Sequence, residues 1–247
     1  MHLRNLSLLI AGFGLIMTVL ACAALENIVI PTPQAIGPCA NILFPTAAGT
    51  TWNYDLYGNT TTTFTRSILS ADETGFTGQD VFPEDKTIHA WKWKCTHGNL
   101  LGPSIDDSPA APGATGWPFD PSMKVATLEN TGTTLPFEVH VGDGWTQTTR
   151  LEGSRIENGK SVTTSLEVTR TCTAARSETI TVPAGTFDGV RIDCQIEQTI
   201  VVTPGGATRP TQFSYSTTDW YAPDVGLVKS VATGAGIDST LLLNSYH

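Results

Sequence analysis

Positive charge is scarce in this sequence. Lysine and arginine together number 14 against 23 aspartate and glutamate residues, so the formal net charge is −9 over 247 residues. The basic residues form no cluster anywhere along the chain. Nucleic acids and anionic lipid surfaces are both bound through basic patches, so the composition argues against either as a partner of the folded domain. Charged residues reach only 15%, which is low for a cytosolic protein.

Motifs that carry catalysis or bind metals are also missing. There is no G-x-S-x-G, no H-E-x-x-H, no Walker loop and no EF-hand loop. No C-x-x-C pair is present, and the cysteine spacings match no zinc pattern. Cys95-x-His97 brings a histidine close to a cysteine, but a cysteine held in a disulfide is no nucleophile. We therefore expect a protein that is not an enzyme, with no catalytic residues, no metal and no cofactor.

Helical periodicity of useful length is absent as well, and an alternating pattern takes its place. Between Glu178 and Glu197 the chain reads as strand, turn and strand, with Pro183 and Gly185 at the turn. After the turn, every second residue from Val190 onward is apolar, which is typical of a half-buried antiparallel strand. Threonine, which favours strands, occurs 38 times. We predict an all-β fold of about 12 strands, in a curved antiparallel sheet or a partly closed β-barrel.

Two segments of the chain open in the same way. Gly49-x-x-Trp52 and Gly142-x-x-Trp145 each precede a strand-like sequence. This echo suggests two duplicated halves at 39–101 and 123–247, although chance similarity is a fair rival. The segment 102–122 between them is rich in proline and glycine and fits no regular structure. It is either a linker between the halves, which we favour, or a functional loop.

The N-terminus reads as a targeting segment, 1–22. An almost continuous apolar run follows Arg4, and Val19-Leu20-Ala21-Cys22 resembles a bacterial lipobox. The resemblance implies that Cys22 becomes the new N-terminus and carries fatty acyl groups such as palmitate. The alternatives are an ordinary secretion signal, for which Ala21-Cys22-Ala23 fits an A-x-A cleavage site, and an uncleaved membrane anchor. All three place 39–247 outside the cytoplasm, in the cell envelope, with the proline-containing segment 23–38 as a tether.

Four cysteines remain beyond the targeting segment. An even number of cysteines in an exported chain predicts two disulfides. Cys172 and Cys194 lie on the strands that flank the central turn, so we pair them, which leaves Cys39 for Cys95. Loop-closure entropy predicts a stabilisation of about 3 kcal/mol for the shorter loop and about 4 kcal/mol for the longer.

One strand carries the candidates for ligand contact. Alternation in Lys86–Cys95 places His89, Trp91 and Trp93 on one face of the strand. Aromatic side chains beside a histidine suit a ligand-binding or sugar-binding surface, but the same face also suits simple packing in the core. We name these three residues as the candidate ligand-binding residues.

Three motifs together resemble a known group of proteins. They are Gly49-x-x-Trp52-x-Tyr54, T-V-P-A-G-T-F-D at 181–188 and W-Y-A-P-D-V-G-L-V-K at 220–229. The combination resembles a family of uncharacterised bacterial cell-envelope lipoproteins that is defined only as a domain of unknown function. The resemblance covers nearly all of 39–247 and implies a β-rich envelope domain without an assigned activity. A more distant similarity, of fold alone, is to the half-barrel of Lol-type lipoprotein carriers.

Three functional hypotheses follow, in order of preference. The first is a non-enzymatic, lipid-anchored envelope module that binds an apolar ligand, a lipid or a protein partner in the hollow of the sheet. The second is a structural or adhesive surface module, and the third is a hydrolase. A large apolar hollow would favour the first, a filled core with exposed strand edges the second, and a cleft gathering His with Asp or Glu the third.

Overall fold

The computed structural model describes residues 39–58, 61–84, 86–104, 108–109, 123–203 and 210–247. These residues form one antiparallel sheet of thirteen strands: β1 (Thr51–Gly58), β2 (Thr62–Ala71), β3 (Gly75–Phe82), β4 (Thr87–Thr96), β5 (Asn99–Ser104), β6 (Ser108–Pro109), β7 (Lys124–Gly132), β8 (Gly144–Glu157), β9 (Lys160–Val182), β10 (Gly185–Thr203), β11 (Thr211–Ala222), β12 (Gly226–Gly234) and β13 (Ile237–Tyr246). Because β6 has only two residues, the expectation of about 12 strands is confirmed. These ranges contain no helix that is long and apolar enough to cross a membrane.

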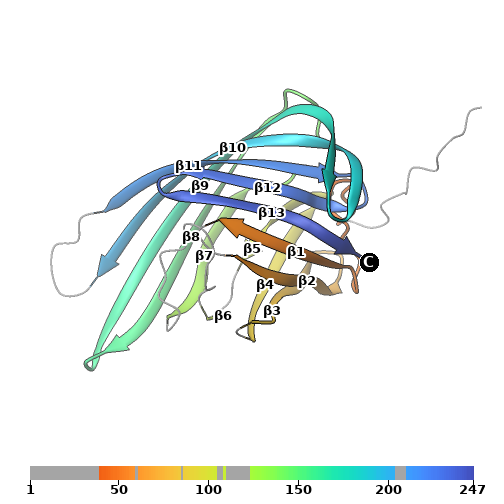
Figure 1. The fold of residues 1–247 in the computed structure, drawn as a ribbon. Coiled ribbons are helices and arrows are strands. Elements are labelled where there is room, and N and C mark those ends of the chain that lie inside the picture. Colours follow the sequence, from red (N-terminus) through yellow and green to blue (C-terminus); the bar gives the residue numbers. More distant parts are fainter. Residues whose placement is uncertain (1–38, 59–60, 85, 105–107, 110–122, 204–209) are drawn as a thin grey trace, which may run out of the picture. The chain divides into compact units, whose positions relative to one another are not determined.

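Nearly every strand pairs with its neighbours in the sequence. The order across the sheet is β5-β4-β3-β2-β1-β13-β12-β11-β10-β9-β8-β7-β6 (Figure 1). The exception is the pairing of β1 with β13, which brings the first and last strands together in the middle of the sheet. The strands of the two suggested halves, β1–β5 and β7–β13, therefore belong to one continuous sheet.

The two edges of the sheet meet at a short seam. Leu100 in β5 forms an isolated antiparallel bridge with Leu135, which follows β7. The amide of Leu100 donates to the carbonyl of Leu135 at 2.8 Å, and the amide of Thr134 donates to the carbonyl of Leu100 at 2.8 Å. Such bonds satisfy backbone groups that a free edge would leave unpaired. The prediction of a curved, partly closed antiparallel barrel is confirmed.

Aromatic and aliphatic side chains fill the inner face of this sheet. In β10 the alternate residues from Val190 to Ile196 are buried, as the pattern predicts. Trp52 and Tyr54 in β1 are almost completely buried, at 1% and 2% exposure. Burial of each such large ring stabilises the fold by about 3 kcal/mol, since hydrophobic stabilisation scales with the apolar area removed from water.

The hairpin of β9 and β10 is longer than the sequence predicts. The alternating pattern predicts the strand before the turn from Glu178 only, but β9 begins at Lys160 and runs for 23 residues. A β-bulge in the β9–β10 pair lets this long hairpin bend. Its turn reaches back to β13, where the amide of Ala184 donates to the carbonyl of Leu243 at 3.1 Å (Figure 1).

Regular structure extends into two segments whose residues favour loops. Tyr221 closely precedes Pro223 and Gly226, but β11 continues through it and turns its side chain inward, opposite Val190. Of the segment 102–122, the first three residues complete β5 and Ser108–Pro109 form β6, so regular structure replaces part of the expected irregular segment. The rest of that segment lies outside the described residues, as do the targeting segment with Cys22 and the tether 23–38.

Both disulfides have the predicted partners. Cys172 and Cys194 stand directly opposite each other in the register of β9 and β10. Cys39 and Cys95 join the segment before β1 to the end of β4, across 56 residues of sequence. One disulfide thus lies in each of the two suggested halves, 39–101 and 123–247.

Candidate functional site

A cavity of about 340 Å³ lies on the inner face of the sheet. Strands β2–β5 supply one part of its wall, and β8, β9 and β11 supply another, so residues far apart in the sequence meet there. The lining residues are Phe44, Arg66, Asp80, His89, Ala90, Trp91, Trp93, Gly102, Pro103, Thr134, Gln147, Arg170 and Tyr221.

The three candidate ligand-binding residues all line this cavity. Their strand alternates as predicted, with Trp91 buried, His89 and Trp93 partly buried, and the residues between them exposed. Trp93 is held by stacking on Phe76 and Phe44, at ring-centroid distances of 5.7 and 5.4 Å. The structure brings the three residues together at one cavity, while their contact with a ligand stays a prediction.

A partly buried ion pair forms one side of the cavity. The Nε and Nη2 atoms of Arg66 donate to the two carboxylate oxygens of Asp80 at 2.8 and 2.7 Å. The indole N–H of Trp91 donates to the same carboxylate at 3.0 Å. Burial opposes the charge on Arg66, but the adjacent Asp80 carboxylate outweighs it and raises the pKa of the guanidinium above its usual value. Arg66 therefore stays cationic among the rings of Tyr54 and Phe64.

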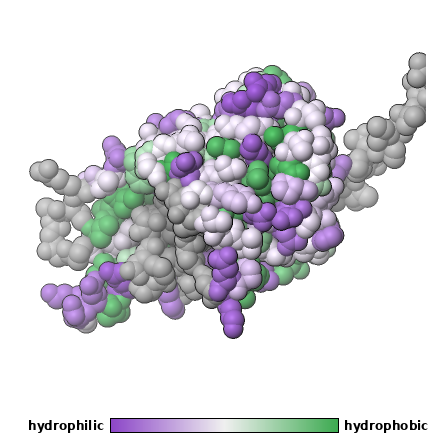
Figure 2. All heavy atoms as spheres, in the orientation of Figure 1, coloured by the Kyte–Doolittle hydropathy of each residue, from purple (hydrophilic) through white to green (hydrophobic). Residues whose placement is uncertain are grey.

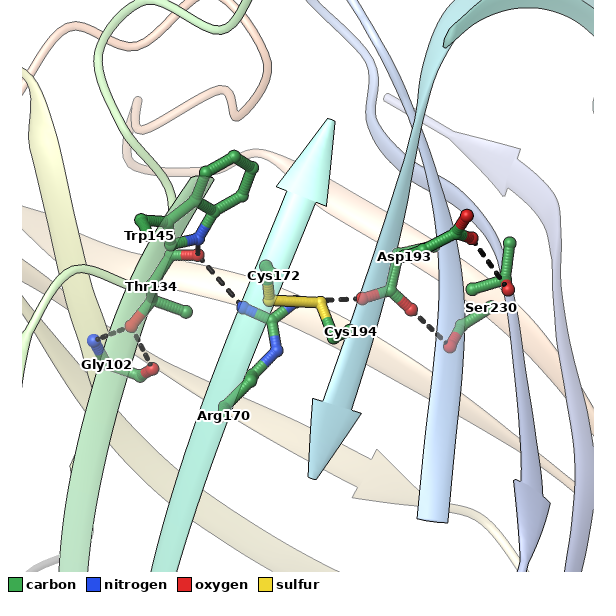
Figure 3. A network of polar contacts seen from close by, with 10 residues as sticks. Gly102, Thr134, Trp145, Arg170, Cys172, Asp193, Cys194 and Ser230 are labelled. Carbon is green, nitrogen blue, oxygen red and sulfur yellow. Dashed lines mark hydrogen bonds and ion pairs between the residues drawn. A yellow bond between two sulfur atoms is a disulfide. The ribbon is translucent and has the colours of Figure 1, made fainter. Parts of the chain in front are cut away.

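A second ion pair lies across the interior and belongs to a longer polar network (Figure 3). Arg170 donates from Nη2 to Asp219 at 2.9 Å and from Nη1 to the carbonyl of Thr134 at 3.0 Å. Ser230 donates to the other carboxylate oxygen of Asp219 at 2.6 Å. The Thr134 hydroxyl accepts from the Gly102 amide at 2.9 Å and donates to the Gly102 carbonyl at 2.8 Å. The network thus connects β5, at the seam, through β9 and β11 to β12.

Two buried tyrosines flank these ion pairs. Desolvation by burial, reinforced by the Asp219 charge, raises the pKa of Tyr221 to about 12. Burial likewise raises the pKa of Tyr54, whose hydroxyl donates to the Leu227 carbonyl at 2.8 Å. Both phenols are therefore neutral hydrogen-bond donors at ordinary pH.

Sequence reasoning missed the polar half of the lining. Arg66 stands between Phe64 and Ile68 on the buried face of β2, and Arg170 occupies an inward position of β9 before Cys172. A charge at an inward position of an alternating strand was the available signal, because buried charges need partners. Their partners, Asp80 and Asp219, lie on other strands, so they could be identified only once the order of the strands in the sheet was known.

A wider groove of about 710 Å³ lies at another place on the molecule. Apolar side chains, among them Leu43, Val139 and Val190, line it together with the carboxylates of Glu138, Glu178 and Asp188. It is more open to solvent than the cavity, and its described lining residues form no buried ion pair with one another. Over the described residues, no group of three or more His, Cys, Asp or Glu side chains is placed to hold a metal ion. We therefore place the candidate site in the smaller cavity.

The outer surface differs from this interior. Figure 2 shows hydrophilic and apolar side chains intermixed over the face in view. Trp220, the neighbour of Tyr221 in β11, points outward, where the Lys229 ammonium lies 4.9 Å from its ring and its indole N–H donates to Glu178 at 2.6 Å. Such contacts satisfy this partly buried indole without a ligand.

Comparison with known proteins gives a partial sequence match and a shared fold. The family model described as DUF3108-like matches residues 128–232, from β7 to β12, which is less than half of the chain. No protein of curated function matches the sequence.

Two solved structures superpose on most of the chain. One is a presumed lipoprotein of Parabacteroides distasonis ATCC 8503, with a TM-score of 0.55 and 17% identity over 84% of this chain and 99% of that one. The other is a presumed exported protein of Bacteroides fragilis NCTC 9343 with a YmcC-like fold, with a TM-score of 0.55 and 18% identity over the same shares. The chain therefore shares its fold with these two proteins and, from β7 to β12, is similar in sequence to a family of unknown function.

Proposed function

We propose that this chain is an exported cell-envelope protein, anchored through lipid on Cys22, that holds an apolar or amphipathic ligand inside its curved sheet without catalysing a reaction. The lipobox-like segment supports the anchor, and two disulfides suit an oxidising compartment. The names of the two proteins that share the fold point to the same location.

The cavity on the inner face is the observation that carries the binding proposal. Its volume of about 340 Å³ is within the range of small-molecule sites, roughly 300–1,000 Å³. Phe44, Trp91 and Trp93 supply apolar walls, and a few polar groups are placed among them. Apolar walls with a small number of fixed polar groups are the usual lining of ligand pockets.

The lining also argues against a hydrolase. His89 and Asp80 are register partners on β4 and β3 and both line the cavity. However, the Asp80 carboxylate already accepts hydrogen bonds from Arg66 and Trp91. None of the described lining residues is a serine, cysteine or lysine, and the hydroxyl of the lining residue Thr134 is already bonded to the amide and the carbonyl of Gly102.

Binding of a polarity-sensitive apolar dye, N-phenyl-1-naphthylamine, tests the proposal. The protein is exported with a cleavable secretion signal in place of 1–22, so that it is soluble and oxidised. We expect the dye fluorescence to rise with the wild type. His89→Trp, which enlarges an inward side chain at the cavity, should abolish the rise, whereas Ile88→Trp on the exposed side of the same strand should keep it. Equal dye binding by both variants would refute the cavity as the site.

A further inference from the structure

Three hydrogen-bond donors from different strands face the same cavity. They are the guanidinium groups of Arg66 in β2 and Arg170 in β9 and the hydroxyl of Tyr221 in β11. Both guanidinium groups are close enough to Tyr221 for their charges to act on its hydroxyl. The cavity wall is therefore polar around Tyr221 and apolar around Trp91 and Trp93.

Tyr221 places a phenol donor at the wall of this cavity. Its side chain is more than nine-tenths buried, with 9% exposure, and it lines the cavity. Because desolvation by burial raises the pKa of Tyr221 to about 12, its hydroxyl is protonated and can donate a hydrogen bond at ordinary pH. A ligand acceptor that meets this donor in a partly dehydrated cavity gains a stronger hydrogen bond than it would form in water.

The two arginines have donors to spare. Each guanidinium carries five N–H donors. In the described part of the chain, the hydrogen bonds of Arg66 run from Nε and Nη2 to Asp80, which leaves Nη1 to donate elsewhere. A quarter of the Arg66 side-chain surface is exposed, and the residue borders the cavity.

The charges of the wall restrict the head group of a ligand. Asp80 and Asp219 neutralise the two arginines, so the wall is formally neutral and offers hydrogen-bond donors rather than net positive charge. At a neutral wall, desolvation costs more for a dianion such as a phosphate monoester than for a singly charged carboxylate, whose two oxygens match a fork of guanidinium and phenol donors. The aromatic side of the cavity suits an apolar tail.

We propose that the cavity binds an amphiphile with a carboxylate head group, whose head accepts hydrogen bonds from Tyr221, Arg66 and Arg170 and whose tail lies against Trp91 and Trp93. This inference rests on the proposed function, because it names the ligand class of the same cavity. Removal of the Tyr221 hydroxyl should therefore weaken binding of the head group and leave the contacts of the tail unchanged.

Isothermal titration with three ligands of equal chain length tests the inference: dodecanoate, dodecanol and dodecyl phosphate, each below its micellar concentration. The soluble oxidised wild type should bind dodecanoate more tightly than either of the others. Tyr221→Phe keeps the ring and removes only the donor, so it should weaken dodecanoate binding by about tenfold or more and change dodecanol binding by less than about twofold. Trp220→Phe, the adjacent outward residue, is the matched control and should leave all three affinities unchanged.

The outcomes separate the inference from the proposed function. Equal affinities for acid and alcohol, or an unaltered dodecanoate affinity in Tyr221→Phe, would overturn the head-group assignment while leaving the apolar cavity in place. Tighter binding of dodecyl phosphate would replace the carboxylate by a phosphate. Binding of none of the three ligands by the folded wild type would refute the proposed function itself. Circular dichroism of each variant establishes that it is folded.

Discussion

Replacing Asp80 by alanine should leave the Arg66 cation inside the sheet without its carboxylate partner. Asp80 accepts two hydrogen bonds from Arg66 and one from Trp91, and its side chain is only 13% exposed. Removal of one partner of a buried ion pair typically costs 3–5 kcal/mol, and the 25% exposure of Arg66 lets some water compensate. We expect a loss of about 2–4 kcal/mol in the free energy of unfolding, or roughly 5–15 °C in Tm for a domain of this size.

Urea unfolding of the oxidised protein, followed by tryptophan fluorescence, measures this loss. Arg66→Met combined with Asp80→Leu replaces the pair by apolar side chains and should restore stability to within about 1 kcal/mol of the wild type. Glu129→Ala removes the partner of Arg150 from a pair in which both side chains are 50% exposed, and should cost no more than about 0.5 kcal/mol. If Asp80→Ala is as mild as Glu129→Ala, the burial of the ion pair has been misjudged.

Three further predictions concern packing, alkaline pH and the anchor. A Cβ at Gly78 would lie 2.1 Å from the Trp91 ring, so Gly78→Ala should cost about 1–3 kcal/mol or more, whereas Gly144→Ala, with no atom nearer than 3.5 Å, should be almost neutral in the same urea assay. The pKa of Tyr221 is raised from about 10 in the unfolded chain to about 12 in the fold, so its contribution to stability is complete below pH 10 and is lost as the pH rises from 10 to 12. Tyrosinate absorbance of the folded protein should show that Tyr221 titrates near pH 12, and a midpoint near pH 10 would contradict this prediction. Cys22→Ala should release the full-length protein from membranes, and its persistence in the membrane fraction would refute lipidation at that residue.

The strands could be predicted because their signals are local. Alternation identified the buried face of β10. Asn158-Gly159, a dipeptide typical of tight hairpin turns, lies between β8 and β9, and both residues have positive φ, at 49° and 73°. The pairing of Cys172 with Cys194 followed from strands that flank one turn. Each of these inferences needs only residues that are close in sequence.

The polar side of the cavity could not be predicted, since it depends on sheet order. Arg66 meets Asp80 because β2 pairs with β3, but Arg170 reaches Asp219 across the intervening strand β10. The closure at Leu100 arises from the curvature of the whole sheet, which no local pattern encodes. The inward position of Tyr221 is hard to predict from the sequence because Pro223 and Gly226, which favour a loop, follow it closely, although β11 extends through it.

Native mass spectrometry of the exported, signal-cleaved protein, purified without detergent, tests the central claim most directly. We predict a complex with a bound mass in the lipid range that is lost on organic extraction and returns on incubation with a lipid extract. The stripped polypeptide should then be four hydrogens lighter than the reduced chain, in accord with two disulfides. A bare polypeptide mass, both as purified and after incubation with lipid, would contradict a ligand-binding cavity and direct the search to protein partners at the cell surface.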